Sequence, residues 1–236
     1  MIRHLSALAL LLLPMSAGAA NRVYAIGSFD RVRVDGPFEV KLMTGKSPGA
    51  RADGDTRAVD TLDVRVEGTT LIVRASANGW GEQSGGRSVS APVISISTLA
   101  IRSATLIGGG RLSVAGAVKG QRIDLQVTGS GTLDAAALDA DQLNATLVGS
   151  GGIKLGGRAA KVRLMTNGTG GIDAVPLRAD DLILLLDGPG EIRATARFTA
   201  NVTSTGLGSV TVYGKPACTV KAIAGGPVSC GKQAAP

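Results

Sequence analysis

Four charged residues recur at regular intervals along this chain and could act together chemically. They alternate in sign and lie 19 or 20 residues apart: Asp134, Lys154, Asp173 and Arg193. Two acids that flank a glycosidic bond can cleave a polysaccharide, one as a general acid and the other as a base or nucleophile. Here a basic residue separates the acids at every step, which neutralises them instead of raising the pKa of one. The pattern favours a structural charge ladder, with a polysaccharide-active lyase or hydrolase as the alternative.

Histidine, which most common catalytic and zinc sites require, occurs once, as His4. It lies in a segment with the marks of a signal peptide: a basic start, an apolar run over residues 5–13 and the small-residue pattern Ala-Gly-Ala at 17–19. We predict cleavage after Ala19, which leaves a mature chain without imidazole. That excludes Ser-His-Asp and Cys-His catalysis and the common zinc sites. We therefore expect a non-enzymatic protein with no catalytic residue, cofactor or metal site.

The same segment predicts the compartment. Its apolar run is too short to span a bilayer, which takes about 20 residues, so we expect an exported chain that is not membrane-spanning, either periplasmic or extracellular. Two cysteines, Cys218 and Cys230, suit an oxidising compartment and are too far apart for a Cys-x-x-Cys redox pair. We predict a disulfide between them that closes the final repeat.

A repeat of about 20 residues must position these side chains. Each copy contains a Gly-x-Gly triplet, whose glycines are Gly108 and Gly110, Gly129 and Gly131, Gly149 and Gly151, Gly168 and Gly170, Gly188 and Gly190, and Gly206 and Gly208. A degenerate copy follows at Gly225 and Gly226. Repeats of this length indicate a solenoid or propeller, in which each unit buries its apolar face against its neighbours. We expect the triplets to be corners, where a missing side chain permits unusual φ angles and close stacking.

Residues next to the triplets alternate between apolar and polar, as in Leu133-Asp134-Ala135. This period of two is typical of a half-buried strand. Two strands in every 20 residues, with the same residue types in each copy, fit a parallel β-helix whose coils stack about 4.8 Å apart. We predict an all-β solenoid with six to seven coils over residues 101–231. Residues 20–100 form less regular N-terminal strands with a Gly-rich loop, and residues 232–236 form a tail.

Apolar residues interrupt two of the polar columns and could form an interface. They are Met165, Ile183 and Leu185, and Trp80 stands in the Gly-rich loop. A contiguous exposed apolar patch usually marks an interaction site. We predict that these residues contact a protein partner, a second copy in a homo-oligomer, or the N-terminal segment of the same chain.

Basic residues recur at the second, looser corner: Lys119, Arg158, Arg178, Arg197 and Lys215. They predict a ridge that could bind an anionic cell-surface glycan, although neighbouring aspartates dilute its field. The formal charge of +7 is otherwise scattered, and the chain has one Trp, two Tyr and three Phe. So few aromatic rings leave little for base stacking, and we expect no nucleic-acid partner.

The order of the segments resembles a known family. The runs FDRVRVDGPFEVKLMTG and VRVEGTTLIVRA, the tandem Gly-Ser-Gly-x-Leu copies and the final VTVYGKP are similar to the autotransporter adhesin head GIN-domain family. The resemblance extends from Phe29 to Gly231. It implies a right-handed, single-stranded β-helix in an exported bacterial protein. Together with the residues above, it predicts a binding or structural module, adhesin-like or associated with the cell envelope, whose partner is an unknown protein or a cell-surface glycan.

Overall fold

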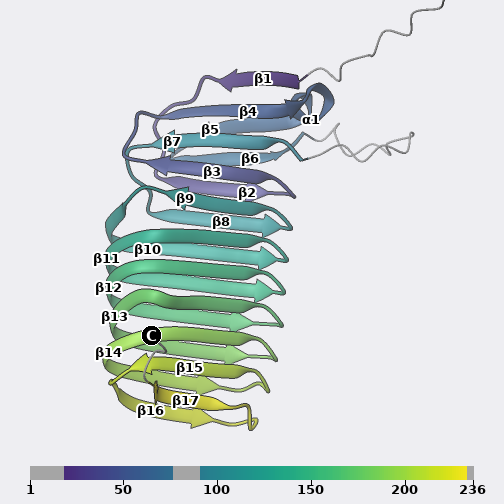
Figure 1. Ribbon diagram of the computed structural model, residues 1–236. Helices are drawn as coiled ribbons and strands as arrows, with labels where there is room; N and C mark the ends of the chain where they lie inside the picture. The colour runs from purple at the N-terminus through teal and green to yellow at the C-terminus, as the bar shows by residue number, and fades with distance from the viewer. Residues whose placement is uncertain (1–18, 77–90, 233–236) are drawn as a thin grey trace, which may run out of the picture.

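The computed structural model describes residues 19–76 and 91–232, which wind into a tall stack of coils (Figure 1). Trp80 and the first 18 residues of the predicted signal peptide lie outside the described residues. Neighbouring coils of the repeat region pair through parallel strands in register. The predicted all-β solenoid is therefore confirmed. In the described chain, no helix is long and apolar enough to cross a membrane.

Short strands build the N-terminal part of the stack, and longer strands build the repeats. The first group is β1 (Ala19–Tyr24), β2 (Arg31–Asp35), β3 (Glu39–Thr44), β4 (Gly49–Asp55), β5 (Leu62–Glu67), β6 (Thr70–Ala75), β7 (Val93–Thr98), β8 (Ser103–Gly108) and β9 (Arg111–Ala115), with the helix α1 (Thr56–Asp60) between β4 and β5. The second group is β10 (Val118–Gly129), β11 (Thr132–Gly149), β12 (Gly152–Asn167), β13 (Gly171–Asp187), β14 (Glu191–Ser204), β15 (Ser209–Gly214), β16 (Ala217–Ala222) and β17 (Val228–Lys232).

Each coil contributes one strand segment to each of two faces. β11 begins beside β9 at Thr132, turns through the second corner, and ends beside β10 at Gly149. We call the face that follows the triplets the downstream face; it contains β3, β7, β9, β15, β17 and the first parts of β11 to β14. The opposite, upstream face contains β2, β6, β8, β16 and the last parts of β10 to β14. β-bulges at the second corner, such as the register shift between Ala135 and Leu138, help the chain turn there.

The triplets form the other corner, and stacking leaves no room for side chains there. Gly129 has φ +115°, and a Cβ on it would lie 2.7 Å from the carbonyl oxygen of Gly108 in the coil before. A Cβ on Gly131 would lie at the same distance from the oxygen of Gly110. The glycine pairs thus let successive coils hydrogen-bond through their corners, as Gly131 N–H does with the Gly108 oxygen at 2.8 Å.

Apolar side chains that point inward from both faces fill the interior. Leu106, Val127 and Leu147 are successive members of one such inward column, which continues through the buried Thr166 to Leu186. Because their partners lie in register on the neighbouring coils, each coil buries its apolar side mainly against the next one.

The order of coils in the N-terminal part differs from the order of the chain. β2 and β3 stack directly on β8 and β9, and β6 and β7 stack in turn on β2 and β3. β4 and β5 then pair antiparallel with β7 and β6, and β1 pairs antiparallel with β4. With Val59 of α1 and Leu62 buried, these antiparallel strands cover the N-terminal end of the interior.

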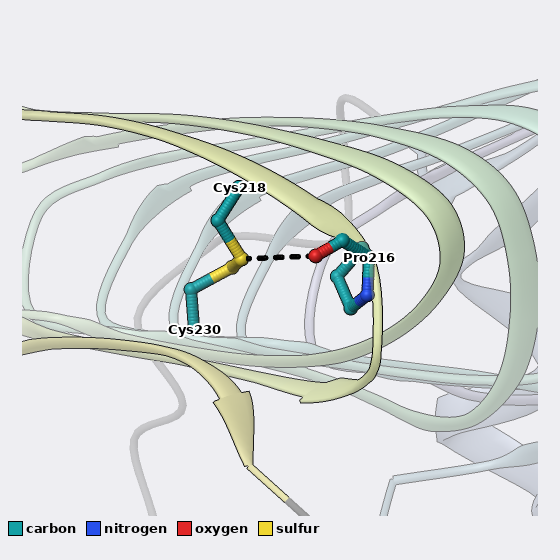
Figure 2. Close-up of a disulfide and its surroundings, with 3 residues drawn as sticks. All are labelled: Pro216, Cys218 and Cys230. Carbon is teal, nitrogen blue, oxygen red and sulfur yellow. Dashed lines mark hydrogen bonds between the residues drawn. A yellow bond between two sulfur atoms is a disulfide. The ribbon is translucent and has the colours of Figure 1, made fainter.

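The last described coil consists of β16 and β17, joined by a disulfide. Cys218 and Cys230 are bonded, with their Cα atoms 6.3 Å apart, and Figure 2 shows the bond between the two strands. Cys218 lies in register with Ala200 and Cys230 with Val212, both buried inward-facing residues. The predicted disulfide is confirmed. It links the two faces at inward positions that buried apolar side chains occupy in the preceding coils.

Candidate binding surface

A shallow hollow of about 420 Å³ lies on the downstream face. Its floor is formed by Gly152 and Gly171, which are paired in register on adjacent coils. The same outward position carries Arg111, Thr132 and Glu191 on the flanking coils. The hollow therefore exists because two successive coils lack a side chain where their neighbours have one.

The fold itself does not require these two glycines. A Cβ on Gly152 would meet nothing closer than 3.7 Å, and a Cβ on Gly171 nothing closer than 3.4 Å. By contrast, a Cβ on the preceding residue, Gly151 or Gly170, would lie 2.2 or 2.3 Å from a carbonyl oxygen. Glycine inside a strand lowers stability by about 0.5–1 kcal/mol relative to alanine. Sequence analysis missed both floor positions, although doubled glycines after the triplets, at 151–152 and 170–171, mark them.

The charged residues predicted to form a ladder line one side of this hollow. Asp134, Lys154, Asp173 and Arg193 lie in register on four successive coils. Arg193 contacts Asp173 at 2.7 Å and Glu191 at 3.9 Å. The rim therefore presents both signs of charge over a short distance, and the guanidinium of Arg193 bridges two of its three carboxylates.

The arrangement of the predicted pair of acids, Asp134 and Asp173, is unlike that of a glycosidase. Asp173 uses both oxygens, accepting from the Val175 N–H at 3.2 Å and from Arg193 at 2.7 Å. Asp134 lies two coils away, about 10 Å along the stack, with Lys154 between them. Retaining enzymes hold their carboxyl groups about 5–5.5 Å apart and inverting enzymes about 6.5–9.5 Å. Across residues 19–76 and 91–232, no cluster of three or more His, Cys, Asp or Glu side chains could hold a metal ion.

The basic residues at the second corner are brought only partly together. Lys119, Asp139, Arg158 and Arg178 follow one another in register, so an acid interrupts the predicted ridge. Arg158 donates to the two oxygens of Asp139 at 2.7 and 2.9 Å, and these hydrogen bonds hold the pKa of Asp139 below its usual value.

Arg197 and Lys215 fall outside this column. A register shift between Ala174 and Arg178 places Thr195 beside Arg178. Arg197 instead lies 3.8 Å from Asp180. Lys215 follows at the corner after β15. Three of the five basic residues therefore share a column that Asp139 interrupts, and the other two, Arg197 and Lys215, lie outside it.

The apolar residues predicted as an interface lie on the upstream face. Met165 and Leu185 are in register and half-buried, and Ile183 is 41% exposed. Val148, which sequence analysis missed, is 40% exposed on the coil before Met165. The described strands β1 to β9 stack on the N-terminal side of β10 and do not lie over this patch (Figure 1).

Comparison with known proteins finds one family model that matches most of the chain. A family model described as "Putative auto-transporter adhesin, head GIN domain" matches residues 28–216. The curated proteins contain no match.

Several solved structures share this fold. A "putative adhesin" from Bacteroides fragilis is 22% identical, with a TM-score of 0.79 over 91% of this chain and 97% of that one. A "putative lipid binding protein" from Parabacteroides distasonis is 19% identical, with a TM-score of 0.75 over 92% and 98%. A "putative adhesin" from Parabacteroides merdae is 16% identical, with a TM-score of 0.71 over 92% and 98%. At these identities the likeness supports a shared fold.

Proposed function

The chain belongs to the auto-transporter adhesin head GIN-domain family, and from that membership we propose that it is an exported, non-enzymatic module that binds a cell-surface glycan in the glycine-floored hollow. The names of the similar structures, two adhesins and a lipid binding protein, are all those of binding proteins. A disulfide and the predicted signal peptide support export.

The glycine floor is the observation that carries the proposal. Gly152 and Gly171 reduce strand stability and relieve no clash, so their effect is to open the surface. A glycine in a strand often marks a site where a ligand or another backbone approaches closely. A sugar ring that lies on this floor can contact backbone that a side chain would otherwise cover. The volume of about 420 Å³ falls within the range of about 300–1,000 Å³ for small-ligand sites.

The rim offers what a polyhydroxylated ligand needs. Each sugar hydroxyl both donates and accepts a hydrogen bond. Asp134 and Glu191 can accept, Lys154 can donate, and the Thr132 hydroxyl can do either. The coils hold the backbone of these residues at a fixed spacing, so no main-chain segment has to become ordered when a ligand binds. Cleavage is not favoured, because Asp173 is already engaged by Arg193 and by the Val175 N–H.

A filled-floor variant tests the proposal. The substitutions Gly152→Thr and Gly171→Thr place side chains in the hollow without a backbone clash. The matched control is Gly27→Thr, because a Cβ on Gly27 meets nothing within 4 Å and Gly27 lies outside the hollow. On an array of bacterial and host surface glycans, we expect the double variant to lose at least about tenfold in affinity, equivalent to about 1.4 kcal/mol. The control should bind as the unaltered protein does.

Two results would contradict this function. Absence of any bound glycan on the array would remove glycan recognition altogether. Equal binding by the filled-floor variant and the control would place the ligand elsewhere on the surface. Circular dichroism and thermal melting of each variant establish that any loss of binding is not a loss of fold.

A further inference from the structure

The C-terminal end of the stack is an apolar opening. Val220 lies in register with the buried Val202, yet it is 46% exposed, because among the described residues no coil follows β16 and β17. The disulfide and Val228 occupy inward positions of the same coil. The opposite end differs, since antiparallel strands and the buried Val59 cover it.

Two large apolar side chains project at the glycine corner beside this opening. Leu207, the middle residue of the Gly206 triplet, is 73% exposed, and Ile223, directly after β16, is 63% exposed. Ile223 N–H bonds to the carbonyl oxygen of Ser204, so the last corner is held against the coil above it. Their exposure is thus a feature of an ordered corner.

The charged side chains near this end are all positive. Glu191 is the last acidic residue of the sequence, and residues 192–236 contain Arg193, Arg197, Lys215, Lys221 and Lys232. Arg193 and Arg197 contact aspartates on the preceding coil. The three lysines border the last coil: Lys221 on β16, Lys232 on β17 and Lys215 between β15 and β16. In the described part of the chain, these lysines form no ion pair.

We propose that this end docks on an anionic lipid surface, with Lys215, Lys221 and Lys232 at the headgroups and Leu207 and Ile223 at the boundary of the acyl region. Lysines beside exposed aliphatic side chains are the combination that interfacial membrane binding uses. The free backbone N–H groups of the terminal strands would meet headgroup phosphates, which accept hydrogen bonds, and would stay out of the hydrocarbon, where unpaired groups are not tolerated.

The charge distribution selects this occupant over two others. A second copy docked end to end would cover the opening but would bring two sets of three lysines together, which is unfavourable. An anionic polysaccharide would pair with the lysines but leave Leu207, Val220 and Ile223 in water. A lipid surface would pair with the lysines and would also remove the aliphatic side chains from water. Docked in this way, the stack stands on the membrane with its two faces in water, so the inference is independent of what the hollow binds.

Vesicle co-sedimentation with the full exported chain tests the inference. We expect binding to phosphatidylglycerol vesicles and little binding to phosphatidylcholine vesicles. Each lysine near an anionic surface contributes about 1 kcal/mol, or about fivefold in partitioning. The triple variant Lys215→Gln, Lys221→Gln, Lys232→Gln should therefore bind phosphatidylglycerol about 100-fold more weakly. The matched control removes three lysines from the rest of the chain, with Lys46→Gln, Lys119→Gln and Lys161→Gln, and should bind nearly as the unaltered protein does.

A second variant and a second probe separate the other occupants. Leu207→Ser with Ile223→Ser keeps the charge, and it should also weaken binding to phosphatidylglycerol. Equal losses of vesicle binding in the triple lysine variant and its control would mean that net charge alone causes the binding, and would overturn the inference. Binding to soluble dextran sulfate without binding to the vesicles would assign the end to a polysaccharide. Dimers that form without vesicles and disappear in the Leu207→Ser, Ile223→Ser variant would assign it to a second copy.

Discussion

Substituting two adjacent glycines should have opposite effects on stability, because only one of them lies in a corner contact. A Cβ on Gly170 would lie 2.3 Å from the Gly151 carbonyl oxygen and 2.9 Å from Cδ2 of Leu147. The first distance is 1.1 Å short of the 3.4 Å at which ordinary contact begins. Gly170→Ala must therefore push two coils apart at the triplet corner.

That displacement has a calculable cost. Gly170 N–H bonds to the Gly149 oxygen at 2.9 Å and Gly171 N–H to the Gly151 oxygen at 3.2 Å. Both distances would then exceed the hydrogen-bonding range, and each lost bond costs about 1 kcal/mol. Overpacking adds about 1–3 kcal/mol. The expected loss for Gly170→Ala is about 3–5 kcal/mol. Gly171→Ala has its nearest neighbour at 3.4 Å, so we expect a gain of about 0.5–1 kcal/mol.

Urea unfolding followed by circular dichroism measures both variants. With a denaturant slope of about 2–3 kcal/mol per molar, Gly170→Ala should lower the unfolding midpoint by about 1–2.5 M, and Gly171→Ala should raise it slightly. Equal midpoints for the two variants would refute the stacking argument, because they would mean that the corner tolerates a side chain as readily as the open floor does. Destabilisation by Gly171→Ala would refute the claim that the fold does not require the floor glycines.

Two further outcomes follow from contacts in the stack. Replacing Cys218 and Cys230 by Ser should lower the free energy of unfolding by about 3 kcal/mol. Amide hydrogen exchange should become faster in β16 and β17 and stay slow in β11 to β13, because coils contact mainly their neighbours. A uniform increase in exchange along the chain would contradict this. The pKa of Asp139 is lowered by its hydrogen bonds from Arg158, so its contribution to stability is present above the unfolded-state value of about 3.9 and is lost as the pH falls through the folded-state value. In a carboxyl-carbon NMR titration, Arg158→Gln should move the Asp139 midpoint upward, and an unmoved midpoint would show that the ion pair has no effect on the carboxyl group.

The regular part of the fold could be predicted from the sequence because its pattern is local. Alternation around Leu133 and Ala135 places both side chains inside, and the triplet spacing indicates where each coil turns. Parallel stacking then puts equivalent residues side by side, which is why Asp134 and Lys154 could be paired from their positions alone. The two cysteines could be paired for a related reason, since both fall in the final repeat of an exported chain.

The N-terminal strands and the second corner could not be predicted in this way. The stacking of β2 and β3 on β8 and β9 joins segments more than 60 residues apart without a shared motif. The bulge that moves Arg197 out of the basic column depends on how the chain packs around the second corner. The period of the repeat alone does not specify these register shifts. Basic residues that recur once in each repeat therefore do not all lie in one column of the structure.

The sequence by itself determined which side chains face the interior, because a period of two follows from the strand backbone alone. It also determined the coil length and the closing disulfide. Only the tertiary structure decided the shape of the surface. Gly152 and Gly171 form a hollow only because stacking places them next to each other between Thr132 and Glu191. Val220 is exposed only because, in the described chain, no coil follows β16 and β17. The shape of the surface depends on which coils are neighbours, and the packing of the whole stack determines this order.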